Sequence, residues 1–347
     1  MPRELVVADR ERLELRSYEA PPLEDNELRI RSDFSSNKHG TLFRKYRGDP
    51  NEWHTDFERR HRISLAEPSY PNYPLHVGNM TVGTVTEVGA DVTAFAVGDR
   101  VYGHLPIRET HTVRPETVSA APAGMAPEAI VYTNPAGVGV HLVRDGGVKL
   151  GDCVAVFGAG AIGQMTAQLA RLAGARFIVV SDPVAERRRA AAASGADLVV
   201  DPTESDAAIA IKEAVTAGVE PGVDVALETS AAYAALDDAV RAVAYGGTVA
   251  SCAYYEGDSA ALSLAAEFHR NDVSITSIQP GSSDVMALHP RWEYRHLHEE
   301  AFRHLEAGAI NVDGLIGPVV SLDEAPATIE QLVADPSLGI KTAVRYD

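Results

Sequence analysis

The feature that most constrains this chain is a glycine-rich segment that directly follows a run of apolar residues. Residues 154–157 read Val-Ala-Val-Phe, and an alanine- and leucine-rich stretch begins after the glycines. Gly158 permits a tight turn after a strand, Gly160 lets a pyrophosphate approach the backbone, and Gly163 lets the next helix pack close to the strand. Unpaired N–H groups at the start of that helix attract phosphates. We therefore predict a dinucleotide-binding turn formed by Gly158, Gly160, Ala161, Ile162 and Gly163.

An acidic residue stands where the next apolar strand is expected to end. Asp182 follows Gly158 by 24 residues, close to the spacing of roughly 20 residues for the carboxylate that binds the adenosine ribose of NAD. Its charge would repel a 2′-phosphate, so Asp182 favours NAD over NADP. Arg187 is near enough in the sequence to bind such a phosphate, and NADP therefore stays open as the less favoured cofactor. The competing interpretation is a structural glycine turn followed by an aspartate that caps a helix.

From residue 152 onward, apolar segments alternate with helical ones. This alternation predicts a parallel sheet with helices on both faces, and the glycine turn identifies it as a doubly wound Rossmann domain over residues 149–283. Helices are expected at residues 162–173 and 231–244. The expected strands are residues 153–157, 177–181, 198–200, 223–227, 248–253 and 274–278.

The first part of the chain alternates polar and apolar residues instead, with glycines between the segments. This pattern favours a β-rich, barrel-type domain, because every second residue of a strand faces the same side of its sheet. Residues 49–74 are charged, aromatic and proline-bearing without clear periodicity, and are expected to form a long loop or lid. The expected strands lie within residues 4–35, including 27–32, and at 81–89 and 97–102.

The end of the chain contains an amphipathic helix at residues 293–308 and a last strand at 341–346. Both are expected to pack back on the β-rich domain. That domain would then comprise residues 1–148 and 284–347. Two domains also agree with the length of 347 residues, which is more than one ordinary core requires.

The charge balance limits the partners of the protein. The formal net charge is −18, from 31 basic and 49 acidic residues, which repels nucleic acid and anionic membranes and would suit a cationic substrate such as an amino sugar. No apolar run reaches the length of a membrane span, and the N-terminus lacks a secretory signal, so we expect a cytoplasmic protein. The two cysteines lie in apolar segments and are expected to be core thiols.

Four motifs, together with the order of the parts, resemble the medium-chain dehydrogenase/reductase superfamily, of the alcohol and polyol dehydrogenase type, over essentially the whole chain. The resemblance implies a GroES-like β-rich catalytic domain made from both chain ends, a Rossmann domain, an interdomain cleft for a small-molecule substrate, and a homodimer or homotetramer. The motifs are the segment from Val82 to Gly89, the segment from Phe95 to Val101, Leu150-Gly151-Asp152, and Phe268-His269-Arg270.

The chain departs from this family where many members bind a catalytic zinc ion. Those members use a cysteine in the first domain, a histidine after a glycine, and a later cysteine or glutamate. By motif position these places are taken here by Lys38, Asn79 and Asn134, and the four-cysteine lobe that holds a structural zinc is also missing. An ammonium group and carboxamides are poor zinc ligands. We therefore expect an enzyme that binds no zinc or other metal.

The replacements still suit the chemistry of an alcohol dehydrogenase. Burial lowers the pKa of a lysine toward neutrality, so Lys38 is expected to act as acid and base toward the substrate oxygen. Asn79 and Asn134 are expected to donate amide hydrogens to that oxygen or to orient Lys38. The alternative is a site that has lost its zinc, in which Lys38 only reaches solvent or pairs with an acid.

Neighbouring residues are weaker candidates. His39 is expected to contact cofactor phosphate or substrate, or else to be a turn residue. Tyr132 and Thr133 flank Asn134 and are expected either to bind substrate hydroxyls or to serve packing. A second group, on a loop of the first domain, consists of His104, Arg108 and His111. At most one of these three residues is expected to contact the substrate.

The reaction expected from these residues is hydride transfer between NAD and a secondary alcohol or ketone. The family resemblance makes a sugar, a polyol or an aminocyclitol or aminoglycoside-type molecule the expected substrate. One alternative is a redox-neutral epimerase or lyase that retains NAD. Another is a nucleotide-binding sensor without catalytic activity.

Overall fold

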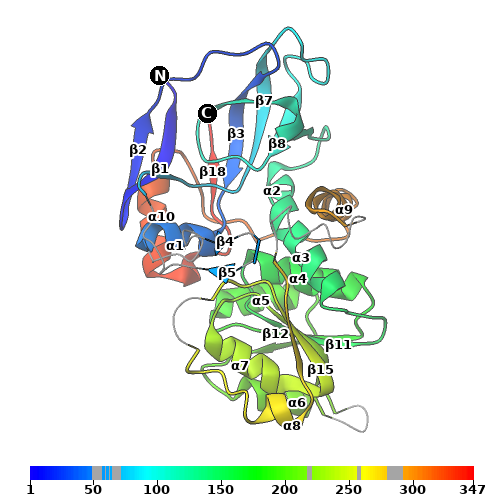
Figure 1. The fold of residues 1–347 in the computed structure, drawn as a ribbon. Helices are drawn as coiled ribbons and strands as arrows, with labels where there is room; N and C mark the ends of the chain where they lie inside the picture. Colours follow the sequence, from blue (N-terminus) through cyan, green and yellow to red (C-terminus); the bar gives the residue numbers. More distant parts are fainter. Residues whose placement is uncertain are drawn as a thin grey trace. The chain divides into compact units, whose positions relative to one another are not determined.

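The computed structural model describes residues 1–48, 57–58, 60–61, 63–64, 72–216, 221–255, 259–279 and 292–347. The chain divides into two compact units (Figure 1). The first comprises Met1–Val131 and Ile316–Asp347, so it contains both chain ends, and the second comprises Tyr132–Leu315. None of the described helices is long and apolar enough to cross a membrane.

The second unit is built on a parallel sheet with the strand order β13-β12-β11-β14-β15-β16. This is the doubly wound Rossmann order, in which the chain reverses direction across the sheet at the first strand, β11. All five residues of β11 are buried, as expected for a strand covered on both faces. The strands are β11 (Cys153–Phe157), β12 (Phe177–Ser181), β13 (Leu198–Val200), β14 (Val223–Glu228), β15 (Val243–Ser251) and β16 (Ser274–Ser277).

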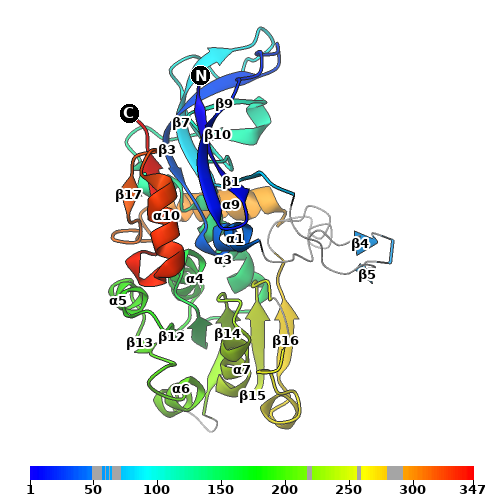
Figure 2. The same cartoon turned by 90° about the vertical axis from the view of Figure 1, so that its left-hand side faces the viewer.

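Helices cover both faces of this sheet. The strand order reverses at β11, and the connections between parallel strands are right-handed. Helices α4 and α5 therefore lie on one face of the sheet, and α6 and α7 lie on the other (Figures 1 and 2). On the second face, Ile211 of α6 and Val240 of α7 join Ala155 and Phe157 in one buried core. The helices are α3 (Thr133–Asp145), α4 (Ala161–Leu172), α5 (Ala185–Ala193), α6 (Ala207–Ala214), α7 (Tyr233–Ala242), α8 (Glu267–Arg270) and α9 (Tyr294–Glu306).

Helices α3 and α9 belong to this second unit by their contacts. Eleven consecutive residues of α3, from Thr133 to Val143, are buried, so this helix needs neighbours on all sides. It packs against α4 and also against α9, which buries Leu297, Ala301 and Leu305. The expectation that the helix at residues 293–308 packs on the β-rich domain is therefore wrong. The predicted domain limits, at residues 148 and 284, differ from the limits of the compact units for the same reason.

The first unit is β-rich. Its larger sheet has the order β10-β8-β7-β3-β18-β17, with β9 also paired to β3, and a smaller sheet has the order β2-β1-β6. The elements are β1 (Arg3–Asp9), β2 (Arg12–Ser17), β3 (Leu28–Ser36), α1 (His39–Arg47), β6 (Leu75–His76), β7 (Met80–Val88), β8 (Arg100–Gly103), β9 (Thr110–Val113), β10 (Val118–Ala120), α2 (Pro127–Ile130), β17 (Val319–Val320), α10 (Ala325–Ala334) and β18 (Ala343–Arg345), with short 3-10 helices at Pro115–Thr117 and Pro336–Leu338.

The segment at residues 49–74, expected to be a loop or lid, lies mostly outside the described residues. Its described parts include two short strands, β4 (Phe57–Glu58) and β5 (Ile63–Ser64), which pair antiparallel.

Strand β3 determines which residues of the first unit meet. Its last residue, Ser36, pairs with Met80 at the start of β7 and with Ala343 at the start of β18. Residues that follow β3 therefore lie beside residues that precede β7 and β18. This register brings together Asn37, Lys38, Asn79 and Lys341, although the last is distant from the others in the sequence.

Candidate active site

The glycine turn of the second unit is closed by backbone contacts. Gly158 follows β11 with φ +92°, a conformation that L side chains rarely adopt, and its N–H donates to Ser181 O at 2.8 Å. A Cβ at Gly163 would lie only 1.8 Å from Gly158 O, so a side chain there collides with the turn itself. A Cβ at Gly160 would meet no atom within 4 Å. Gly160 is also the N-cap of α4 and provides no side-chain cap, as befits a helix start that receives an anion.

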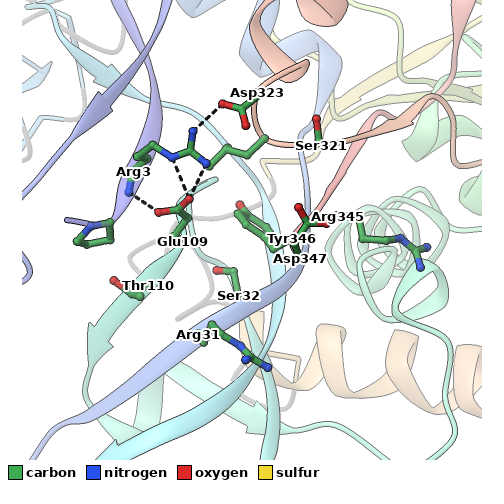
Figure 3. Close-up of a pocket in the computed structure, with 12 residues that line it drawn as sticks. Arg3, Arg31, Ser32, Glu109, Thr110, Ser321, Asp323, Arg345, Tyr346 and Asp347 are labelled. Atoms are coloured by element: carbon green, nitrogen blue, oxygen red, sulfur yellow. Dashed lines mark hydrogen bonds and ion pairs between the residues drawn. The ribbon is translucent and has the colours of Figure 1, made fainter.

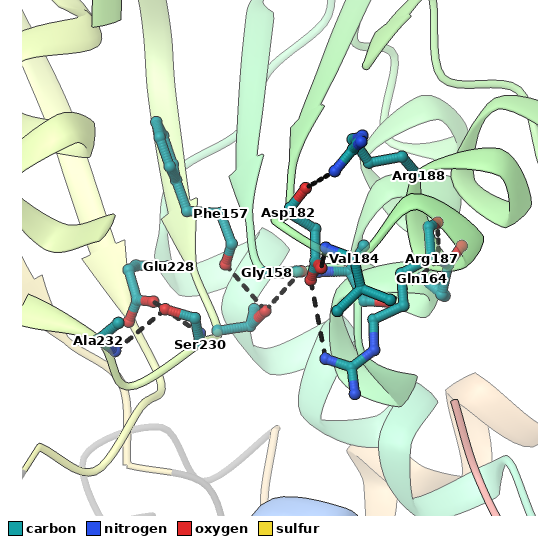
Figure 4. Close-up of polar contacts among 12 residues, drawn as sticks. Phe157, Gly158, Gln164, Asp182, Val184, Arg187, Arg188, Glu228, Ser230 and Ala232 are labelled. Carbon is teal, nitrogen blue, oxygen red and sulfur yellow. Dashed lines mark hydrogen bonds and ion pairs between the residues drawn. The ribbon is translucent and has the colours of Figure 1, made fainter. Parts of the chain in front are cut away.

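Asp182 is held against this turn (Figure 4). Its Oδ2 accepts a hydrogen bond from Ala159 N at 2.7 Å, and its Oδ1 accepts one from Val184 N at 2.8 Å. The Arg187 guanidinium lies 3.9 Å from Oδ2, whereas Arg188 forms an ion pair with Asp201 at 2.5 Å. Two main-chain donors therefore fix an acid beside the expected cofactor turn.

A second buried carboxylate stands on the other side of the turn. Glu228, at the end of β14, is fully buried and accepts hydrogen bonds from Ser230 N at 2.6 Å and from the Ser230 hydroxyl (Figure 4). It also accepts hydrogen bonds from Ser251 Oγ at 3.1 Å and from the Tyr255 hydroxyl. Burial raises the pKa of Glu228, and these hydrogen bonds oppose the shift. A Cβ on Gly158 would lie 2.9 Å from Ser230 Cβ, so this network also confines the turn. Sequence analysis missed it, although a glutamate at the end of an apolar strand was a visible signal.

In the first unit, Lys38 is the N-cap residue of α1 and lies close to a second lysine. Lys341 is completely buried, and its Nζ donates to Asn37 O at 2.7 Å and to Asn79 Oδ1 at 3.3 Å. Burial, reinforced by the positive charge of Lys38, lowers the pKa of Lys341 well below its ordinary value. Sequence analysis missed Lys341, because a lysine at the start of a strand is normally on the surface.

His39 ties α1 to the same C-terminal segment. Its Nε2 accepts a hydrogen bond from Thr342 N at 3.1 Å and lies 3.0 Å from Thr342 Oγ1, while the ring stacks on Phe43. Because Nε2 accepts from an N–H group, the neutral ring carries its proton on Nδ1. This arrangement favours a structural role for His39 over contact with substrate.

Asn134 of the second unit, only 3% exposed, meets two side chains of α9. Its Nδ2 donates to Tyr294 Oη at 3.0 Å and to His298 Nε2 at 3.1 Å. His298 Nδ1 lies 2.7 Å from the main-chain oxygen of Tyr294 and must donate to it, so Nε2 is the acceptor and the carboxamide orientation is determined. A Cβ at Gly137 would lie 2.8 Å from the His298 ring, so a glycine makes room for it.

These hydrogen bonds compete with the donor role expected for Asn134. Its amide nitrogen donates to two side chains of α9, which favours its oxygen as the group that meets a substrate. The sequence did not indicate these bonds, because Tyr294 and His298 come from a helix that we expected to pack on the other domain. Their i,i+4 spacing on an amphipathic helix was the available signal.

Tyr132, Thr133 and Arg108 are held by other parts of the protein. Tyr132 is completely buried and donates its phenol proton to Leu315 O at 2.8 Å, and Thr133 is buried at the start of α3, so packing is favoured over substrate binding for both. Arg108 pairs with the buried Glu4 at 2.8 Å.

The two histidines of the same loop differ. Burial, and then the charge of Arg108, lower the pKa of His111 to about 3, so its ring is neutral. Surrounding protein atoms, and then the charge of Lys38, lower the pKa of His104 as well. His104 is therefore the member of its group that lies within electrostatic range of Lys38.

The residues at the family's zinc-ligand positions do not fit a zinc ion. Lys38 would bring a positive charge to the metal, and Asn79 Oδ1 already accepts a hydrogen bond from Lys341. In the part of the chain that the structure describes, no three His, Cys, Asp or Glu side chains converge in a group that could hold a metal.

A cavity of about 310 Å³ lies in the first unit near both chain ends (Figure 3). Arg3, which lines this cavity, pairs with Glu109 at 2.9 Å and with Asp323 at 2.6 Å. None of the residues singled out from the sequence lines it. We therefore do not assign the active site to this cavity.

Comparisons with known proteins identify the family of the chain. A family profile described as an alcohol dehydrogenase GroES-like domain matches residues 53–140, and one described as a zinc-binding dehydrogenase matches residues 161–291. The D-guloside 3-dehydrogenases of Shigella flexneri and of Escherichia coli K12 are each 34% identical over 338 residues, which cover 95% of this chain and 95% of each relative.

Solved structures show the same fold. That of 2R,3R-butanediol dehydrogenase from Bacillus subtilis is 22% identical with a TM-score of 0.78, and all of both chains is covered. Galactitol-1-phosphate dehydrogenase from Escherichia coli gives a TM-score of 0.75 at 18% identity, with 99% of each chain covered. The GroES-like domain and the Rossmann sheet predicted from the sequence are thus confirmed. The chain belongs to the medium-chain dehydrogenase/reductase superfamily and is an enzyme of its alcohol dehydrogenase type.

Proposed function

We propose that the enzyme is an NAD-dependent dehydrogenase/reductase that needs no zinc and interconverts a secondary alcohol and a ketone on a sugar or polyol. One observation beside Lys38 carries the proposal: a second amine, that of Lys341, donates a hydrogen bond to Asn79. Asn79 stands at the position where family members that bind zinc have a ligand. Such a site offers positive charge and amide hydrogens to the substrate oxygen.

The glycine turn and Asp182 are the residues that would hold the cofactor. NAD, when bound, takes up or returns the hydride. The N–H groups at the start of α4 would bind its pyrophosphate, and the fixed carboxylate of Asp182 would accept ribose hydroxyls and disfavour a 2′-phosphate. Arg187, adjacent to Asp182, would lie at the same end of the cofactor.

Lys38 is the general base in oxidation and the general acid in reduction. In oxidation its neutral amine takes the hydroxyl proton as the hydride leaves carbon, and in reduction its ammonium returns that proton. Asn79 Nδ2 donates to the same oxygen as negative charge develops there. Asn134 Oδ1 accepts a hydrogen bond from a hydroxyl or an amine of the substrate.

Two observations support the substrate class. The relatives that cover most of the chain are named as dehydrogenases of a guloside, and more distant ones as dehydrogenases of butanediol and reductases of xylulose. The compounds in these names all carry a secondary hydroxyl group, or a ketone, beside another oxygen-bearing carbon. The net charge of −18 extends the class to aminocyclitols and aminoglycosides, which are cationic.

We further propose a homodimer or homotetramer joined through the Rossmann sheets. Strand β16 lies at the edge of its sheet, and all four of its residues are exposed. Among the described residues no further strand pairs with this edge, which is therefore suited to pairing with a second copy.

A panel of glycosides, polyols and aminocyclitols, assayed with NAD and with NADP on protein of measured metal content, tests this proposal. We expect stoichiometric NADH formation on a glycoside or polyol. The Lys38→Met variant should lose about 10³-fold in kcat while NAD binding stays intact. Native turnover by this variant would refute the acid and base role. Substrate conversion without net NADH would indicate an epimerase or lyase, and NAD binding without conversion of any compound would indicate a sensor.

A further inference from the structure

Three segments of the first unit that are far apart in the sequence meet around one amine. Lys341 Nζ contacts Asn37 O and Asn79 Oδ1, and the bond to Asn37 spans 304 residues of sequence. The same strand start adds two further contacts, because Asn37 N donates to Thr342 O at 3.3 Å and Thr342 N donates to His39 Nε2 at 3.1 Å. Residues 37–39 are thus fixed on both sides of Lys38.

We propose that Lys341 is a positioning residue, which orients the Asn79 carboxamide. This inference rests on the proposed function of Lys38 and Asn79. It assigns a role in catalysis to a residue that does not itself meet the substrate.

The hydrogen bond from Lys341 fits one orientation of the Asn79 carboxamide. Lys341 Nζ donates to Asn79 Oδ1 at 3.3 Å, so the carboxamide oxygen faces the amine. The amide nitrogen is then turned away from Lys341. Asn79 N also donates to Ser36 O at 2.8 Å, so its backbone is fixed as well as its side chain. The proposed donor to the substrate oxygen is thereby oriented before the substrate binds.

The burial of Lys341 makes this positioning strict. The side chain is 0% exposed, so water does not replace the amine if it is removed, and both oxygens would be left without this donor. The Asn79 side chain could then rotate and present its oxygen where its nitrogen is required. An error of this kind in a catalytic hydrogen bond costs about 100-fold in rate.

A double-mutant cycle on kcat tests the inference, with Lys341→Met, Asn79→Ala and the double variant in the full chain. We expect each single variant to lose about 10- to 100-fold in kcat, and the double variant to be within about threefold of Asn79→Ala, because Lys341 acts through Asn79. The dissociation constant of NAD should not change. Losses that multiply in the double variant would overturn the inference, as would native kcat in Lys341→Met or in Asn79→Ala.

Lys45→Met is the matched control. Lys45 is a partly buried lysine of α1 that donates to the main-chain oxygen of His76 at 2.8 Å, and its pKa is also lowered by burial. It contacts neither Asn37 nor Asn79 in any hydrogen bond described, so its replacement should leave kcat within about threefold of native. A loss equal to that of Lys341→Met would show a general effect of removing lysines from this unit and would overturn the inference.

If Lys341→Met does not fold, Asn79→Asp is the variant that tests the orientation of the side chain at position 79. The aspartate keeps an oxygen for Lys341 but has no amide hydrogens, so the protein should unfold at the same or a higher denaturant concentration while kcat falls about 100-fold. Native kcat in Asn79→Asp would overturn the inference. The underlying function is tested separately, because native turnover of Lys38→Met would refute that function, whereas multiplicative losses in the cycle would refute only the role of Lys341.

Discussion

The glycine turn of the second unit and the Lys38 segment of the first unit both begin where a strand ends, but they are held in different ways. The turn is fixed by main-chain contacts over a short stretch, since Gly163 lies against Gly158 O and Asp182 accepts from Ala159 N. The Lys38 segment is fixed by side chains and by residues from the far end of the chain. The proposed cofactor site therefore depends on backbone shape, whereas the proposed catalytic site depends on a few buried polar atoms.

The largest effect that tests this contrast is expected at Gly163. Gly163→Ala should lower the free energy of unfolding by about 3 kcal/mol or more, because the added Cβ would lie 1.8 Å from a main-chain oxygen that cannot move away easily. Denaturant unfolding measures this loss.

Gly160→Ala is the matched control, because a Cβ there meets no atom within 4 Å. It should unfold within about 1 kcal/mol of native and yet bind NAD more weakly, since the methyl group occupies the approach of the pyrophosphate. Equal stability of the two variants would contradict the account of the turn.

A smaller effect is expected at Asp182. Asp182→Asn keeps the size of the side chain but removes the charge, so the affinity for NAD should fall about tenfold and the preference over NADP should shrink. Titrations with both cofactors measure this change. Asp201→Asn, which removes a nearby acid that pairs with Arg188, should leave the preference as it is. An unchanged preference in Asp182→Asn would exclude Asp182 from the ribose site.

A change that builds up gradually with pH is expected at a buried histidine of the first unit. His111 is 3% exposed, and its pKa is lowered from 6.5 to about 3. Between these values the unfolded chain binds a proton that the folded chain excludes, so the free energy of unfolding should fall as the pH falls through this window, by about 1.4 kcal/mol per pH unit. His111→Gln should remove this contribution. An identical pH dependence of unfolding in both proteins would show that His111 titrates normally.

The same contrast explains what the sequence revealed. The six strands of the Rossmann sheet, the glycine turn and the acid at Asp182 were predictable because their signals lie within short, periodic segments. Lys341 was not, because a lysine is rarely buried and its partners are fixed only by the register of β3 with β7 and β18. The orientation of Asn134 depends in the same way on the packing of α9 against α3, which no local pattern specifies.

The turnover of metal-depleted protein on a confirmed substrate tests the central claim most directly, because it asks whether an amine takes the place of a metal. Protein treated with a strong chelator, and shown by elemental analysis to contain no transition metal, should keep its full kcat, and adding zinc should not raise it. Loss of turnover on chelation and its recovery with zinc would contradict the account.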